Sequence, residues 1–151
     1  MTNEIHADHA SGSTLYAVIR SEAGQVWCPA QEVFESWGAG GHTADDYDIA
    51  LADHDGSRYV GDFDASVPAG RYFIQVFLQA GTNPADSDTV VSSRHILWTG
   101  SGELTAAKCL ANKAVQNRAT GAITYYDDDG LTALFTHVIL DTPAAVSRSP
   151  N

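Results

Sequence analysis

Basic side chains are scarce in this chain of 151 residues, which has eight Lys and Arg against nineteen Asp and Glu. The resulting formal net charge of −11 at pH 7 repels phosphate backbones and anionic lipid headgroups. Nucleic acid and membrane surfaces are therefore not expected as partners. The same acidity is compatible with good solubility, with cation binding or with a saline habitat, and composition alone does not separate these.

Cysteines and long apolar runs are also scarce. The two cysteines, Cys28 and Cys109, are far apart and form no Cys-x-x-Cys motif, so we expect free thiols, although pairing in an oxidising compartment stays open. No run approaches the ~18 apolar residues needed to cross a bilayer. Residues 1–13 lack the basic start and apolar stretch of a secretory signal. We therefore expect a soluble chain without a secretion signal.

Catalytic and metal-binding motifs are missing as well. No serine lies in a Gly-x-Ser-x-Gly elbow, and no Cys–His signature of a thiol nucleophile occurs. The six histidines are scattered, and His6, Asp8 and His9 make only a weak metal clip on a polar segment. We predict no enzymatic activity, no cofactor and no metal site. A glycosidase with carboxylates from two strands is an enzyme class that the pattern leaves open.

Three acidic clusters could supply oxygen ligands to calcium, at residues 45–48, 53–56 and 127–130. None has the EF-hand spacing of acids, glycine and a final glutamate. Asp-Gly between two alternating segments is the usual signal of a tight hairpin turn, so we interpret residues 127–130 as a turn. Calcium binding is a weaker alternative.

What the sequence has in abundance is short segments in which apolar and polar side chains alternate. Tyr72, Ile74, Val76 and Leu78 share one face of an extended segment, which is typical of a strand with one buried side. Comparable segments, separated by turn residues, cover 15–20, 25–27, 47–51, 58–63 and 89–98. The chain is therefore predicted to be mainly all-β.

Six or seven strands at this spacing predict an immunoglobulin-like β-sandwich over residues 14–100, preceded by an extended arm over residues 1–13. Trp27 and Trp98 lie in strongly alternating segments and are predicted to be buried. Trp37 stands beside the glycine-rich residues that follow it and is predicted to be displayed to solvent.

Residues 101–151 form an extension with a different pattern. A short helix is predicted between residues 104 and 115, followed by a hairpin whose strands cover residues 122–126 and 131–140, and then by a polar tail. A lone hairpin is only marginally stable in water. This extension must therefore pack on the sandwich or on another subunit, which points to a component of an assembly.

The segment from residue 111 to residue 130 resembles a segment of uncharacterised virion proteins of tailed bacteriophages and prophages, where it follows a β-domain. Upstream residues 16–20, 24–27, 46–51 and 68–72 are similar to the same group, so the resemblance spans about residues 15–148. It carries no active-site motif. It implies a non-enzymatic structural protein of the virion, in the capsid decoration, neck, tail or baseplate, which is made in the host cytoplasm.

The expected partners are other virion structural proteins and further copies of this chain. The predicted partner-contact residues are Ile5, Trp37, Val115, Ile123, Tyr125, Leu134 and Phe135. The alternative function is a carbohydrate-binding or host-surface adhesion module, with Trp37 as the residue expected to meet a glycan.

Overall fold

The computed structural model describes residues 3–105, 107–108, 112–127, 129–142 and 145–150. Beyond residue 138 it describes the backbone and not the side chains. The chain divides into two compact units, Met1–Glu103 and Leu104–Asn151. No helix among the described residues has the length and apolar character to span a membrane.

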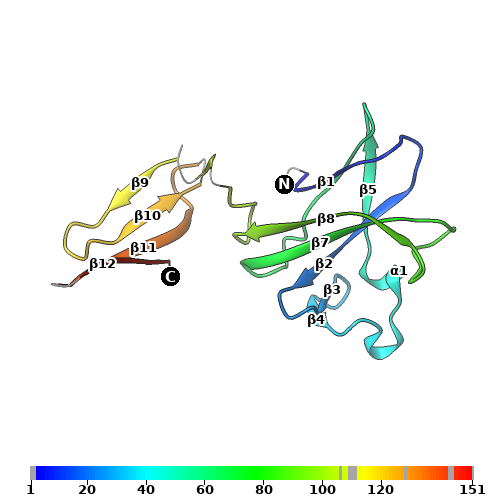
Figure 1. The fold of residues 1–151 in the computed structure, drawn as a ribbon, viewed down its shortest axis with the longest axis horizontal. Helices are drawn as coiled ribbons and strands as arrows, with labels where there is room; N and C mark the ends of the chain where they lie inside the picture. The colour runs from blue at the N-terminus through cyan, green and yellow to red at the C-terminus, as the bar shows by residue number, and fades with distance from the viewer. Residues whose placement is uncertain (1–2, 106, 109–111, 128, 143–144, 151) are drawn as a thin grey trace. The chain divides into compact units, whose positions relative to one another are not determined.

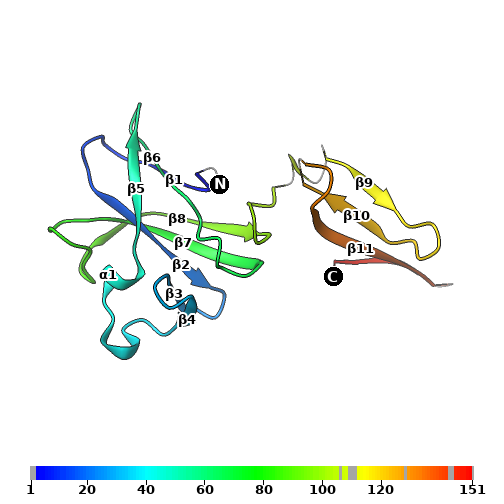
Figure 2. The same cartoon turned by 180° about the vertical axis from the view of Figure 1, so that it is seen from behind.

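The first unit consists mainly of strands, as Figures 1 and 2 show. Its elements are β1 (Ile5–Asp8), β2 (Leu15–Ser21), β3 (Val26–Cys28), β4 (Val33–Glu35), the 3₁₀ turn η1 (Ala39–Gly41), α1 (Ala44–Tyr47), β5 (Ile49–His54), β6 (Arg58–Gly61), β7 (Gly70–Leu78) and β8 (Thr89–Trp98). The strands form one eight-stranded, nearly closed sheet in the order β1-β6-β5-β2-β3-β4, with β7 on the other edge of β2 and β8 beyond β7. The prediction of a mainly all-β chain with little helix is confirmed.

Strand β2 holds this sheet together because it pairs with three other strands. Its first half pairs with β5, Arg20 pairs with β3, and its whole length pairs with β7. The five residues from Leu15 to Ile19 are all buried. Alternate side chains enter two different clusters: Leu15 and Ile19 enter the larger one, while Tyr16 enters a smaller one on the opposite face. The first unit therefore has apolar packing on both faces of its central strand.

The predicted alternation in β7 is confirmed, because Tyr72, Ile74 and Val76 are buried on the face of the larger cluster. The prediction for two of the tryptophans is confirmed as well. Trp27 and Trp98 are both buried, and the Trp98 indole nitrogen donates to the backbone carbonyl of Val67 at 3.0 Å. A buried indole N–H with a partner avoids the cost of lost hydration.

The first residues of the chain do not form the predicted extended arm. Residues Ile5–Asp8 make strand β1, which pairs antiparallel with β6. Ile5 and Ala7 are buried, whereas His6 and Asp8 are exposed, so this short segment does have an apolar face. The prediction of Ile5 as a partner contact is therefore wrong, because its side chain is fully covered by its own chain.

One arginine links the outer strand β8 to the segment that precedes β1. Arg94 donates to both carboxylate oxygens of Glu103, at 2.9 and 3.0 Å, and also to the backbone carbonyl of Glu4. A bidentate pair of this kind fixes geometry as well as charge. It is consistent with the nearly closed form of the sheet.

A buried carboxylate organises the loop before β8. Asp88 accepts hydrogen bonds from the backbone N–H groups of Ala80 and Ala85, at 3.1 and 2.9 Å, and from the Tyr16 hydroxyl at 3.2 Å. These bonds, led by that from Ala80, hold the pKa of Asp88 below its ordinary value. The carboxylate thus ties the loop between β7 and β8 to β2.

We expect Asp88→Asn to change how stability depends on pH. Because the pKa is lowered by folding, the stabilisation is present above the ordinary value of 3.8 and is lost as the pH falls through the folded value. The melting temperature of the variant should lie below that of the parent at about pH 6, and the gap should shrink towards about pH 2.5. The exposed Asp55→Asn is the control, and a gap of constant size would contradict the assignment.

The second unit is a four-stranded antiparallel sheet in the order β12-β11-β10-β9. Its strands are β9 (Ala114–Gln116), β10 (Ile123–Tyr126), β11 (Ala133–Thr142) and β12 (Ala145–Pro150). The predicted hairpin is confirmed as β10 and β11, and the predicted turn before β11 is closed by a bond from the Gly130 N–H to the Asp127 carbonyl. β12 lies in what was predicted to be a polar tail.

The helix predicted between residues 104 and 115 does not reach residue 115, because the end of this stretch belongs to strand β9. Much of it, including Cys109, lies outside the described residues. Only residues 107 and 108 are described as helical in this stretch, and β9 begins at residue 114.

Candidate functional site

The sheet formed by β9 to β12 is a single layer within the second unit (Figures 1 and 2). From residue 104 to residue 138, none of the side chains whose exposure is described is buried. All four residues of β10 are partly exposed. Sheets in folded domains usually bury one face against a second layer. This sheet is therefore a candidate contact surface.

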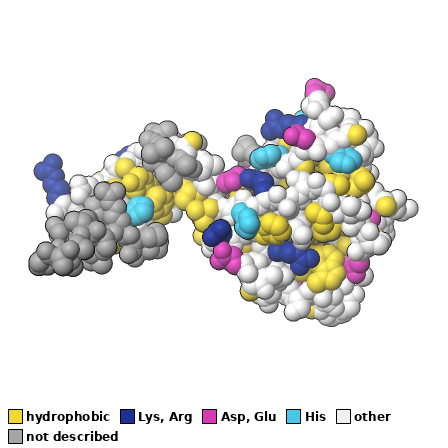
Figure 3. All heavy atoms as spheres, in the orientation of Figure 1, with side chains coloured by type: hydrophobic (Ala, Val, Ile, Leu, Met, Phe, Trp, Pro, Cys, Tyr) yellow, Lys and Arg dark blue, Asp and Glu magenta, His cyan; other side chains and the backbone are white. Residues whose placement is uncertain are grey.

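The register of β10 and β11 places aromatic side chains on one face. Ile123 is opposite His137, and Tyr125 is opposite Phe135. The rings of Tyr125 and Phe135 are stacked, with centroids 4.6 Å apart and planes 11° from parallel. His137 stands edge-on to both rings, at 5.6 and 4.8 Å. We call these four residues the aromatic face; Figure 3 shows hydrophobic side chains gathered beside a histidine in this unit.

The opposite face of the same sheet carries threonines and aliphatic side chains. The hydroxyl groups of Thr124 and Thr136 lie 3.0 Å apart and are hydrogen-bonded. Val115 is 43% exposed and pairs with Thr124, so it lies on this face. Leu134 is the extra residue at an irregularity in the pairing, because Tyr125 pairs with Phe135 whereas Tyr126 pairs with Ala133. Of the five predicted contact residues of this segment, three therefore lie on the aromatic face, Val115 lies on the other face, and Leu134 lies at the irregularity.

Trp37 does not form the displayed platform that the sequence predicts. Its side chain is partly buried and packs against the smaller core cluster. The ring lies tilted against Tyr47, with centroids 5.0 Å apart, and the Arg20 guanidinium carbon lies 4.8 Å from its centroid. The prediction of a displayed Trp37 is wrong, because the side chain is partly buried and its ring is already in contact with Tyr47 and Arg20.

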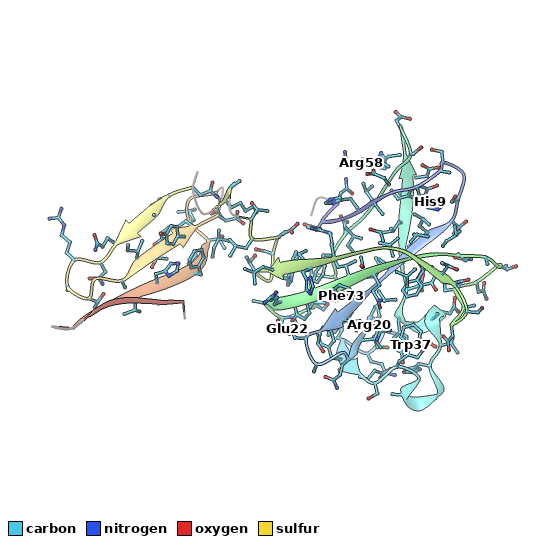
Figure 4. All side chains as sticks on the ribbon, in the orientation of Figure 1. His9, Arg20, Glu22, Trp37, Arg58 and Phe73 are labelled. Carbon is cyan, nitrogen blue, oxygen red and sulfur yellow. The ribbon has the colours of Figure 1, made fainter. Side chains whose placement is uncertain are left out.

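A shallow open pocket of about 360 Å³ lies over β2, β7 and β8. Its lining includes Arg20, Glu22 and Phe73, which are labelled in Figure 4. The Arg20 guanidinium in its lining is hydrogen-bonded within the chain, because it donates to the Gln75 side chain at 2.6 Å and to the Gly24 carbonyl at 3.3 Å. Because the Arg20 guanidinium already has these partners, the pocket offers little that would select a charged ligand.

A cluster of polar side chains lies beside the smaller core cluster of the first unit, to which Cys28 belongs. Glu35 is the register partner of Val26, and Cys28 lies two residues further along β3, so the two side chains share a face of the β3–β4 hairpin. Gly38 then begins a reversal with positive φ, which a residue with a side chain rarely adopts. This reversal returns the chain so that His42 comes back beside Glu35.

Short hydrogen bonds connect the members of this cluster. The Glu35 carboxylate oxygen Oε1 lies 2.6 Å from His42 Nδ1 and accepts a 2.8 Å bond from the Tyr47 hydroxyl. The Gly38 N–H in turn donates to the Tyr47 oxygen at 3.1 Å. The bond to His42 and then that to Tyr47 lower the pKa of Glu35, and the bond to Glu35 raises the pKa of His42.

Cys28, Glu35 and His42 each place one potential ligand atom within 4.8 Å of the other two. In the sequence, Cys28 stands as an isolated thiol, His42 is one of six scattered histidines, and no motif marks Glu35 as a ligand. The signal that could have brought them together is the hairpin formed by residues 26–35, which places Cys28 and Glu35 on one face, followed by the glycine-rich reversal.

Comparison with known proteins finds no matching family model, no matching curated protein and no matching solved structure. The resemblance to virion proteins of tailed phages is therefore carried by the sequence segments quoted above and supports a proposal of function only.

Proposed function

We propose that this chain is a non-enzymatic structural component that assembles by packing the aromatic face of its second unit on the same face of a second copy. The observation that carries the proposal is the single-layer sheet, in which no described side chain from residue 104 to residue 138 is buried. Covering Ile123, Tyr125 and Phe135 would remove apolar and aromatic area from water, which favours association.

The distribution of charge favours a second copy as the occupant. Residues 104–151 contain four basic and four acidic side chains, so this unit is neutral. The remaining four basic and fifteen acidic residues lie in residues 1–103, which therefore carry the whole net charge of −11. Two first units repel each other, whereas two second units approach without that cost. Contact through the second unit keeps the acidic units out of the interface.

The geometry of the aromatic face suits a two-fold contact. Two sheets that pack face to face lie about 10 Å apart, with their inner side chains interdigitated. In a two-fold dimer each residue meets the same surface on the partner, so the stacked Tyr125 and Phe135 of one copy would meet those of the other. Offset and edge-on ring contacts add to the burial of apolar area.

The resemblance to virion proteins supports a place for this assembly in a tailed-phage particle. There the chain would act as a capsid decoration, neck, tail or baseplate accessory. Its other partners would be virion structural proteins that meet the remaining exposed strands, since an unpaired strand edge is a template for a neighbouring chain. The short outer strand β9, with all three residues exposed, offers one such edge.

Sedimentation velocity of the whole chain over a range of concentrations tests this proposal. The mass is expected to rise from 16.1 kDa towards twice that value as the concentration increases. Added salt should strengthen the association, because it screens the repulsion between the acidic first units. A constant mass of one chain at every concentration and ionic strength would overturn the proposal.

A further inference from the structure

We propose that Cys28, Glu35 and His42 form a site for one zinc ion in the first unit. The three residues offer a sulfur, a carboxylate oxygen and an imidazole nitrogen, all within 4.8 Å of one another. This donor set is one that zinc binds in proteins. The inference is independent of the assembly proposal, which concerns the second unit.

The separations are close to those of a zinc site. Ligand atoms at about 2.0–2.3 Å from a tetrahedral ion lie roughly 3.3–3.8 Å from one another. The Glu35 oxygen and the His42 nitrogen are 2.6 Å apart and would separate slightly to admit the ion. The other pairs need to contract by at most about 1–1.5 Å to reach tetrahedral spacing, a change within the reach of side-chain rotation. A water molecule would complete the tetrahedron.

The donor chemistry favours zinc over the hard cations. Calcium and magnesium prefer sites made of oxygen ligands only. A thiolate and an imidazole instead suit zinc and its neighbours among the transition metals. On binding, the Cys28 S–H bond breaks, a sulfur–metal bond forms and the proton passes to water, while His42 binds as a neutral imidazole with its proton on the other ring nitrogen. The thiol contributes one negative charge and the ion two positive charges, so the charge of the site rises by one.

Surrounding groups already hold the ligands in position. The Tyr47 hydroxyl donates to Glu35 at 2.8 Å and is itself fixed by the Gly38 N–H. The His42 ring stands edge-on to the Tyr47 ring, with centroids 6.0 Å apart. Hydrogen-bonded partners that orient the ligands are a regular feature of protein metal sites. Ligands that are already oriented lose less conformational freedom when they bind the ion.

The exposure of the three side chains allows an ion to enter but does not suit a catalytic thiol. The side chains of His42 and Glu35 are 22% and 16% exposed, so an ion can approach from their side. Cys28 is only 1% exposed, which leaves no space for a substrate to reach its sulfur. A nucleophilic cysteine needs such access, whereas a structural metal ligand does not.

Titration of the reduced, full-length chain with Co²⁺, followed by displacement with Zn²⁺, tests the site. We expect one equivalent of Co²⁺ to bind, with a thiolate-to-cobalt charge-transfer band in the near ultraviolet that Zn²⁺ abolishes. Cys28→Ser should remove the band, and the matched variant Cys109→Ser should keep it. Zn²⁺ should also raise the melting temperature of the parent, because an ion that binds only the folded state stabilises it.

Two further variants keep the test valid where Cys28→Ser folds poorly. Glu35→Gln and His42→Gln should each weaken Co²⁺ binding by at least about tenfold, because loss of outer groups alone has effects of this size. His54→Gln, at an exposed histidine on β5, should bind like the parent. The proposal is overturned if no charge-transfer band forms, if Cys109→Ser removes it, or if the variants at Glu35 and His42 bind like the parent.

Discussion

Ile5→Ala is expected to lower the free energy of unfolding of the first unit by about 2–5 kcal/mol. Ile5 is fully buried in the larger core cluster, and its strand β1 is paired with β6. The substitution removes three buried carbon atoms and leaves a cavity that a paired strand can only partly close. Urea unfolding followed by tryptophan fluorescence reports on this unit, because all three tryptophans lie within residues 1–103.

His6→Ala is the matched control for this prediction. His6 is the next residue of the same strand and is exposed on its other side. Its substitution should change the free energy of unfolding by no more than about 0.5 kcal/mol. Should both variants prove equally mild, β1 would be a peripheral strand, and the first eight residues would not belong to the core.

The strands were predictable where large apolar side chains alternate with polar ones. Tyr72 and Ile74 give such a signal in β7, and the structure places both in the core. The signal fails in β1, since Ile5 is its only large apolar residue and Ala7 is too small to mark a face. These two side chains are buried by the pairing with β6, which arises from distant residues and is invisible in the local pattern.

Tyr47 shows a second kind of failure. It alternates with Ile49, and the pattern predicts an extended segment over residues 47–51, yet Tyr47 ends the short helix α1 (Ala44–Tyr47). Thr43 and Asp46 begin this helix with reciprocal side-chain and backbone bonds, a capping box with Asp in place of the usual Glu. Tertiary contacts complete the helix, since the Tyr47 ring and hydroxyl are held by Trp37 and Glu35.

The cluster of Cys28, Glu35 and His42 and the aromatic face could not be predicted from the sequence, because both depend on the register of paired strands. Cys28 and Glu35 share a face only because Val26 is the cross-strand partner of Glu35. In the second unit, the sequence predicts that the hairpin lacks a packing partner, but it does not predict which side chains share a face. A register shift of one residue would exchange the two faces of a strand, so pairing must be known before a surface can be assigned.

Phe135→Asp is expected to weaken the self-association of the chain by at least about 100-fold. Burial of a Phe side chain contributes roughly 1.5–3 kcal/mol, and a carboxylate placed in the same interface would lose its hydration at a cost of several kcal/mol. About 2.8 kcal/mol corresponds to a 100-fold change in the dissociation constant. Phe135 is at the centre of the proposed contact, because its ring stacks on Tyr125 and also meets His137. Sedimentation velocity over a concentration series measures the change.

Leu131→Asp separates the effect of the aromatic face from that of added charge. Leu131 lies in the turn before β11, in the same unit, and its side chain is 81% exposed. The two variants add the same charge to the same neutral unit, so general repulsion acts equally on both. If the face is the interface, Leu131→Asp should associate like the parent while Phe135→Asp stays monomeric, with the tryptophan fluorescence of the first unit unchanged in both. Equal weakening in the two variants would instead mean that net charge governs association and that the aromatic face is not where the copies meet.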